Sequence, residues 1–187
     1  MALTSTTEIP LGFKAPNFQL PDTITGKSFS FENIKGKNGT LVMFICNHCP
    51  YVIHVIDEII EIAYDYQAKG IGFVAISSND ILNYPDDSPE KMETFAEENN
   101  FIFPYLYDES QEIAKAYSAE CTPDFSLFDE NDNCFYRGRL DGSSPGNTHP
   151  TNGFEMRRAI DCMIEKKPIY EPQYPSMGCG IKWKKEA

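Results

Sequence analysis

The sequence predicts an α/β fold in which helices cover both faces of one central mixed sheet. The first observation is a continuous apolar run at residues 41–45, which is typical of a strand buried on both faces. The second is a series of apolar residues at three- and four-residue steps from Val52 to Tyr66, which indicates an amphipathic helix. The third is that strand-like and helix-like patterns go on alternating as far as residue 166. Because the chain has 187 residues, 41% of them hydrophobic, we expect residues 1–187 to form a single domain.

The N-terminal part predicts a β-hairpin that precedes the main sheet. Two short alternating runs, 18–20 and 28–31, flank a segment that is rich in turn-forming residues. The buried strand at 41–45 comes next. Pro50 fits the first turn of the long helix, and Gly70 ends its pattern.

The rest of the chain predicts further strands and helices and an irregular tail. In order, we expect a strand at 71–76, a helix capped by Ser88, a short strand at 104–107, a helix at 109–117, a hairpin of strands 125–128 and 134–137, and a helix at 153–166. Prolines 168, 172 and 175 exclude a regular helix after that point. Residues 168–187 are therefore expected to form an extended tail.

The charge and the hydropathy pattern exclude several classes of partner. The chain carries 28 acidic and 16 basic side chains, so its net charge of -12 repels nucleic-acid phosphates and anionic lipid heads. No apolar run approaches the roughly 20 residues that a membrane-spanning helix needs. The first eight residues lack both a basic leader and an apolar core, so they do not resemble a signal peptide. We therefore expect a cytoplasmic protein that binds neither nucleic acid nor membranes.

Six cysteines are scattered along the chain, and only two of them are closely spaced. They stand at positions 46, 49, 121, 134, 162 and 179. In a reducing compartment most should be thiols, and a Cys-x-x-Cys pair there is usually redox-active or metal-binding. The pair Cys46 and Cys49 is therefore the first candidate site.

The segment Cys46-Asn47-His48-Cys49-Pro50 lies between a predicted strand and a predicted helix. The unpaired N–H groups and the dipole at a helix N-terminus favour a thiolate. Cys46, which comes first and is expected to be the more exposed, is the predicted nucleophile, and Cys49 can then resolve a mixed disulfide at Cys46. A protonated His48 between the sulfurs would lower the pKa of Cys46 and make the disulfide more oxidising.

This arrangement resembles the thioredoxin superfamily. The order strand, Cys-x-x-Cys and helix is matched downstream by Cys121-Thr122-Pro123, directly before the strand at 125–128. The resemblance implies a thioredoxin-like fold over about residues 15–165, with a cis Pro123 that faces Cys46 and a preceding backbone that pairs with a substrate strand. Pro16-Asn17-Phe18 and the hairpin resemble the redoxin (AhpC/TSA) branch, and the end of the tail is similar to proteins that bear Cys-Asn-His-Cys-Pro. The implied activity is thiol-disulfide exchange, with a disulfide-bearing protein or a small thiol or peroxide as substrate and a thiol as electron donor.

Two departures from related families bear on the reaction. Peroxiredoxins carry a threonine three residues before the peroxidatic cysteine. In this chain the residue three positions before Cys46 is Met43, and the residue three positions before Cys49 is Cys46 itself. Thioredoxins carry a buried aspartate six residues before the first cysteine, where this chain has Thr40. A peroxiredoxin-like thiol peroxidase therefore remains the alternative activity, and no proton acceptor for Cys49 is evident.

Metal binding and additional redox thiols remain open hypotheses. Cys46 and Cys49 have no second ligand pair for structural zinc, and a copper site would need a distant histidine such as His149, so we expect no metal and no cofactor. Cys121 adjoins the Thr-Pro segment and is either a third redox thiol or a packed, silent one. Cys179 lies between two glycines in a tail whose Ile181 and Trp183 should dock on the domain, so it is either an additional resolving thiol for Cys46 or Cys121 or part of a structural clasp.

Overall fold

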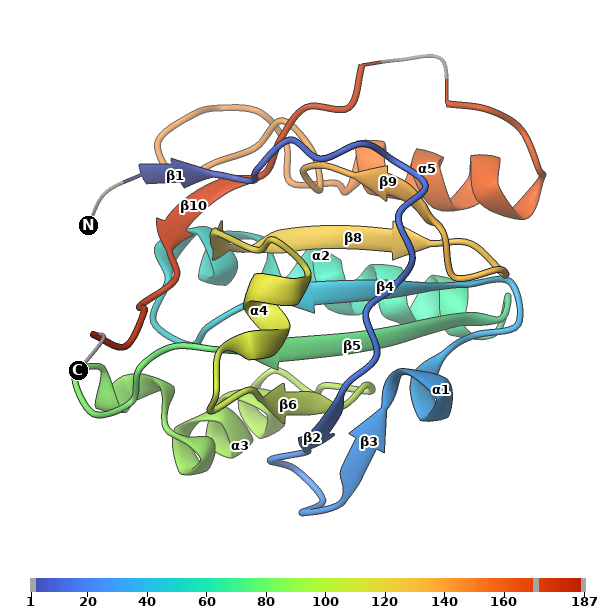
Figure 1. Ribbon diagram of the computed structural model, residues 1–187. Coiled ribbons are helices and arrows are strands. Elements are labelled where there is room, and N and C mark those ends of the chain that lie inside the picture. The colour runs from blue at the N-terminus through green and yellow to red at the C-terminus, as the bar shows by residue number, and fades with distance from the viewer. Residues whose placement is uncertain (1–2, 170–171, 186–187) are drawn as a thin grey trace.

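The computed structural model describes residues 3–169 and 172–185, and its central sheet has five strands (Figure 1). The expectations for residues 1, 2, 170, 171, 186 and 187 lie outside the described residues. The strand order is β6 (Tyr105–Tyr107), β5 (Ile71–Ser77), β4 (Gly39–Phe44), β8 (Asp124–Phe128) and β9 (Cys134–Arg137). The sheet is mixed, as predicted, because β4, β5 and β6 are parallel whereas β8 and β9 are antiparallel to their neighbours.

Helices cover both faces of this sheet, which confirms the predicted fold class. The long helix α2 (Pro50–Gln67) packs together with α3 (Pro89–Glu98) and α5 (Phe154–Ile164) on one face. The opposite face carries α4 (Glu112–Ala116) and the short helix α1 (Phe31–Ile34). Successive residues of β4 point to opposite faces, so Met43 joins the first core and Phe44 the second. A strand buried on both faces explains why the run at 41–45 has no polar residues.

Short elements account for most of the differences from the predicted pattern. The N-terminal hairpin forms as β2 (Gln19–Pro21) and β3 (Ser28–Ser30), but α1 follows it at once because Ser30 caps this helix through a hydrogen bond from the Asn33 N–H. The predicted helix at 109–117 begins only at Glu112, since Gln111 has a φ of 65°. A 3₁₀ helix, η1 (Pro85–Asp87), precedes α3 and was not predicted.

A second sheet joins the two ends of the chain. Its order is β1 (Leu3–Ser5), β10 (Met177–Gly180) and β7 (Cys121–Thr122), and all pairs are antiparallel. Figure 1 shows β1 and β10 side by side at one end of the main sheet. The predicted docking of the tail is thus confirmed, with Ile181 buried and Trp183 packed against the core.

The helices were also compared with the length and hydropathy that a bilayer requires. Within residues 3–169 and 172–185, none combines sufficient length with sufficient apolar character to cross one.

Candidate active site

The two closely spaced cysteines lie where strand β4 passes into helix α2. Ile45 extends the pairing with β5, because its N–H donates to the Ile76 carbonyl oxygen over 3.0 Å. Cys46 follows directly, and Cys49 is the N-cap residue of α2 with Pro50 after it. The free N–H groups and the positive end of the helix dipole therefore lie at the Cys49 end of the motif.

Thr122 contacts both cysteines. Its hydroxyl oxygen lies 3.3 Å from the Sγ of Cys46, and its carbonyl oxygen lies 3.1 Å from the Sγ of Cys49. This meeting follows from the sheet, since β4 and β8 are antiparallel neighbours and Thr122 stands just before β8. The peptide bond between Thr122 and Pro123 is cis, as predicted. The structure thus brings together the two segments that the sequence singled out.

Both sulfur-bearing residues are buried, so the expected difference in exposure between Cys46 and Cys49 is nearly absent. Cys46 is 1% exposed and Cys49 is 0% exposed. One cover is the η1 loop, which is tied to the motif because Asn47 donates its N–H to Asp87 Oδ1 over 2.9 Å and its side-chain amide to the Asp86 carbonyl oxygen. The other cover is β10, which pairs with β7 beside the dithiol.

A shared hydrogen bond couples the two thiols and separates their pKa values. Donation from Cys46 to Cys49 raises the pKa of Cys46, and burial and the negative charge of Asp87 raise this pKa further. The same bond lowers the pKa of Cys49 to about 4, and hydrogen bonds from Cys179 add to that lowering. When the proton lies on Cys49 instead, Thr122 offers it a carbonyl acceptor. The protonation of one thiol therefore depends on that of the other.

His48 forms an ion pair with an aspartate that the sequence did not identify as part of the site. Its Nδ1 atom lies 2.8 Å from Asp87 Oδ2, although the contact is too bent for a normal hydrogen bond. Asp87 is 0% exposed, and its oxygens also accept hydrogen bonds from the Asn47 N–H and from the Asn79 amide over 2.9 and 2.7 Å. Asp87 thus compensates part of any positive charge on His48. The electrostatic potential at Cys46 therefore depends on both residues and not on His48 alone.

The same cluster contains the side chains that come nearest to a metal site. Within residues 3–169 and 172–185, one group of three such side chains could share an ion: Cys46, His48 and Asp87, whose ligand atoms lie within 4.8 Å of one another. The exposed His149 does not belong to it, so the copper hypothesis based on that histidine has no support here. Asp87 also accepts hydrogen bonds from two N–H donors and contacts His48.

The two additional cysteine candidates differ in their position relative to the dithiol. Cys121 is buried, and its Sγ contacts Thr6, Pro123 and the Ser176 carbonyl oxygen at 3.7–4.0 Å. Burial and then the charge of Asp124 raise the pKa of Cys121 to about 12. Cys179, by contrast, stands opposite Thr122 in the pairing of β10 with β7, and Thr122 contacts both sulfurs of the dithiol. Burial and then the interaction with Cys49 raise the pKa of Cys179 to about 12.

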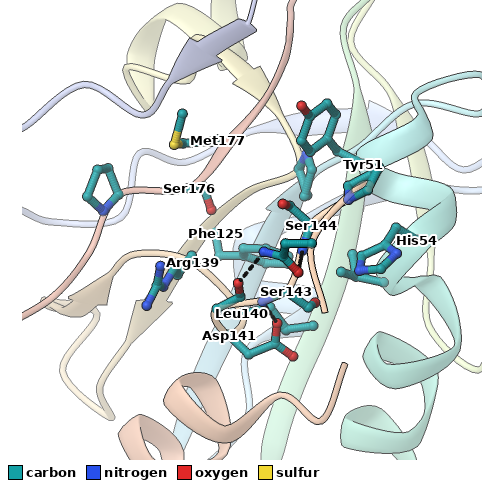
Figure 2. A pocket seen from close by; sticks show the side chains of 16 residues that line it. Tyr51, His54, Phe125, Arg139, Leu140, Asp141, Ser143, Ser144, Ser176 and Met177 are labelled. Atoms are coloured by element: carbon teal, nitrogen blue, oxygen red, sulfur yellow. Dashed lines mark hydrogen bonds between the residues drawn. The ribbon is translucent and has the colours of Figure 1, made fainter. Parts of the chain in front are cut away.

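A small pocket of about 250 Å³ adjoins Pro123 on the side of α2 and the tail. Figure 2 shows Ser176 and Met177 of the tail across from Tyr51 and His54 of α2. Its polar groups are partly engaged, because His54 Nε2 lies 3.2 Å from the Thr151 hydroxyl. The pocket gives a small molecule or a substrate side chain access to the residues around Pro123.

Two residues at this site had little or no distinguishing signal in the sequence. Asp87 belongs to a Pro-Asp-Asp-Ser run before a helix, where acidic residues are common because they favour the helix dipole. Thr122 stands next to Pro123, but nothing in the sequence alone indicates that its side chain and backbone would contact different sulfurs.

Comparison with known proteins gives a family match and two similar proteins. The model of the redoxin family matches residues 10–151. An uncharacterized conserved protein from Geobacillus kaustophilus has a crystal structure that is 51% identical in sequence, with a TM-score of 0.98 over 100% of this chain and 99% of that chain. A provisionally named peroxiredoxin of Mycobacterium tuberculosis is 28% identical over 117 residues, which cover 63% of this chain and 69% of the relative.

More distant solved structures share the thioredoxin-like fold. A provisionally assigned thiol:disulfide interchange protein DsbE from Chlorobium tepidum has a TM-score of 0.65 over 84% of this chain and 99% of that chain. Its sequence identity is 16%, so the similarity concerns the fold alone.

Proposed function

Because this chain belongs to the redoxin family, we propose that it is a thiol-disulfide oxidoreductase whose redox pair is Cys46 and Cys49. The observation that carries the proposal is the joint contact of both sulfurs with Thr122, directly before Pro123. The contact supports the proposal because Cys46 and Cys49 lie next to one another and next to Pro123.

The proposed reaction proceeds through one mixed disulfide. As Cys46 attacks a substrate disulfide, its proton passes along the shared hydrogen bond to Cys49, a new S–S bond forms at Cys46, and one substrate sulfur leaves as a thiolate. Cys49 then attacks the Sγ of Cys46 and gives up its proton, which the leaving substrate sulfur takes up. This step releases the second substrate sulfur and leaves a Cys46–Cys49 disulfide, so two electrons have passed to the substrate. A thiol donor then reduces the protein again.

The direct test is the reduction of insulin with dithiothreitol as the donor. We expect catalytic amounts of the protein to bring forward the precipitation of the insulin B chain relative to dithiothreitol alone. Equal rates with and without the protein would contradict the proposal.

Thiol-dependent peroxide reduction is a second candidate, favoured by the Mycobacterium tuberculosis relative and by one contact. Although Met43 occupies the position of the peroxiredoxin threonine, the hydroxyl of Thr122 lies 3.3 Å from Cys46 Sγ and could bond a peroxide oxygen there. Consumption of hydrogen peroxide at catalytic protein concentrations, with dithiothreitol as donor, separates this activity from insulin reduction.

The proposed partners are a disulfide-bearing protein or a small thiol or peroxide as substrate, and a thiol as electron donor. The pocket beside Pro123 is large enough for one side chain or a small thiol. The proposed compartment is the cytoplasm, where a reducing environment would keep the other four cysteines as thiols.

The charge of Asp87 should control the reactivity of Cys46. The carboxylate raises the pKa of Cys46, so Asp87→Asn is expected to lower that pKa and to speed the alkylation of Cys46 at pH 7 by about 3–10-fold. The measurement is the iodoacetamide alkylation rate of the Cys46 peptide as a function of pH, followed by mass spectrometry.

Asp86→Asn is the matched control for this experiment, because its exposed side chain adjoins Asp87 in the sequence. We expect the alkylation curve of this control to coincide with that of the wild type. A curve for Asp87→Asn that moves to higher pH, or an equal shift in the control, would disprove the assigned role of Asp87.

A further inference from the structure

The tail occupies the backbone edge that a substrate strand would use. β10 pairs with β7 in antiparallel register, with Cys179 opposite Thr122 and Gly180 opposite Cys121. The Ile181 N–H donates to the Glu120 carbonyl oxygen over 3.0 Å and extends this pairing. Since Thr122 directly precedes Pro123, the protein's own chain lies where an incoming peptide is proposed to bind.

The tail can lie this close to Thr122 because Gly178 has no side chain. A Cβ atom on Gly178 would lie 1.9 Å from the Thr122 carbonyl oxygen and 3.2 Å from Cδ of Pro123. Any other residue at this position would push β10 away from β7. Gly178 therefore holds the adjacent Cys179 close to the dithiol.

The segment after Cys179 is anchored on several loops, which fixes the position of this thiol. Lys182 donates its N–H to Asn79 Oδ1 over 2.8 Å, and its carbonyl oxygen accepts the N–H of Asp80 over 2.8 Å. Lys184 donates its N–H to Gln111 Oε1, also over 2.8 Å. With the apolar packing of the tail, these bonds make Cys179 a positioned side chain on an ordered strand.

Cys49 lies between two other thiols. One neighbour is Cys46, which like Cys49 contacts Thr122. The other is Cys179, which stands opposite Thr122 in the pairing of β10 with β7 and contributes to the lowered pKa of Cys49. All three residues are at most 4% exposed and belong to the same core cluster.

We propose that Cys179 is a third redox thiol, which exchanges with the Cys46–Cys49 disulfide at Cys49. Cys179 loses its proton as its sulfur attacks the Sγ of Cys49, the Cys49–Cys179 bond forms, and the Cys46–Cys49 bond breaks. Cys46 leaves as a thiolate and takes up the proton that Cys179 has lost, so one disulfide replaces another and no external oxidant is needed. This step rests on the proposed redox pair, and it identifies Cys49, not Cys46 or Cys121, as the partner of Cys179.

Because of this exchange, the substrate would react at Cys46 and the thiol donor would react at Cys179. The exchange returns Cys46 to the reduced state and moves the disulfide to the tail, two residues after Met177, which lines the pocket beside Pro123 (Figure 2). A thiol donor would then react with the disulfide at Cys179, while Cys46 is already reduced.

The decisive experiment uses the full-length Cys46→Ser protein, in which the first disulfide cannot form. After mild oxidation with diamide and alkylation of the free thiols, peptide mapping should show a Cys49–Cys179 disulfide in most molecules. In the wild type oxidised to one disulfide, the same linkage should account for roughly a tenth or more of the disulfide, because the exchange joins chemically similar bonds. The matched control Cys46→Ser/Cys179→Ser should keep Cys49 alkylatable.

The experiment distinguishes a failure of this inference from a failure of the proposed function. Full alkylation of Cys179 in both the oxidised Cys46→Ser protein and the oxidised wild type would overturn this inference, even if insulin reduction is observed. A Cys49–Cys179 disulfide in a protein that fails to reduce insulin would support the exchange and contradict the proposed activity alone. Cys46→Ala, mapped in the same way, guards against a folding defect that is specific to serine.

Discussion

Replacement of Cys46 by serine is expected to lower the rate of insulin reduction by about 1,000-fold or more. Serine is nearly the same size, so it preserves the packing of this 1% exposed position, but a hydroxyl cannot form the mixed disulfide. The other thiols of the site are not expected to replace it, since Cys49 and Cys179 are proposed to exchange with one another. Insulin turbidity at matched protein concentrations measures the loss.

The partner variant Cys49→Ser should give a different result. Cys46 can still attack a substrate disulfide, but the resolving thiol is gone and Cys179 is proposed to exchange only at position 49, so the mixed disulfide at Cys46 should accumulate. Mass spectrometry without a reductant would detect the added substrate mass. Cys162→Ser, on the half-buried face of α5, is the matched control and should keep full activity. Comparable insulin reduction by all three variants would contradict the assigned roles.

The main sheet and its helices could be predicted because their patterns are long. The run at 41–45 has no polar residue, and the apolar residues of the periodic series between Val52 and Tyr66 fall on one face of a helix. The structure confirms both as β4 and α2. Patterns of this length report burial directly, so local sequence is sufficient to identify the elements.

The second sheet could not be predicted, because its strands are very short and their partners are distant. β7 has two residues, and β10 contains two glycines, which disfavour strands in isolation. What stabilises the pairing is the contact of Gly178 with Thr122 and the burial of Ile181. Such tertiary contacts leave no periodic signal in the sequence.

The residues of the candidate site also fall into those that could be predicted from the sequence and those that could not. Spacing alone identified Cys46 and Cys49, and a family resemblance pointed to Pro123. Asp87, however, reaches the site through a loop between β5 and α3, and its role depends on burial. The burial of both cysteines could not be predicted, because the sequence does not show that η1 and β10 cover the end of α2.

A buried ion pair behind the Thr-Pro segment should control much of the stability of this region. Arg137 Nη2 lies 3.5 Å from Oδ2 of Asp124, and both side chains are almost fully buried. Arg137 also donates hydrogen bonds to Ser126 Oγ and to the carbonyl oxygens of Ser118 and Thr7. Burial raises the pKa of Asp124 to about 6, against an ordinary value of 3.8, and the charge of Arg137 opposes that rise. Asp124 therefore depends on Arg137 for compensation of its charge.

We expect Arg137→Met to lower the free energy of unfolding by about 3–5 kcal/mol at pH 8, because it leaves the Asp124 carboxylate buried and uncompensated. In the wild type the folded state binds more protons at Asp124 than the unfolded state between pH 3.8 and about 6. Stability from this group therefore falls as the pH rises through that range, and the cost is complete above it. Loss of the arginine raises the pKa of Asp124 further, so the deficit of the variant should shrink when Asp124 is protonated at pH 5.

Urea unfolding at both pH values measures the difference, and adding Asp124→Asn should restore most of the stability lost at pH 8. Arg139→Met, which removes a half-exposed partner of Glu155, is the control and should cost about 1 kcal/mol or less. An equal deficit at pH 5 and pH 8, with no recovery in the double variant, would show that Arg137 acts through packing alone.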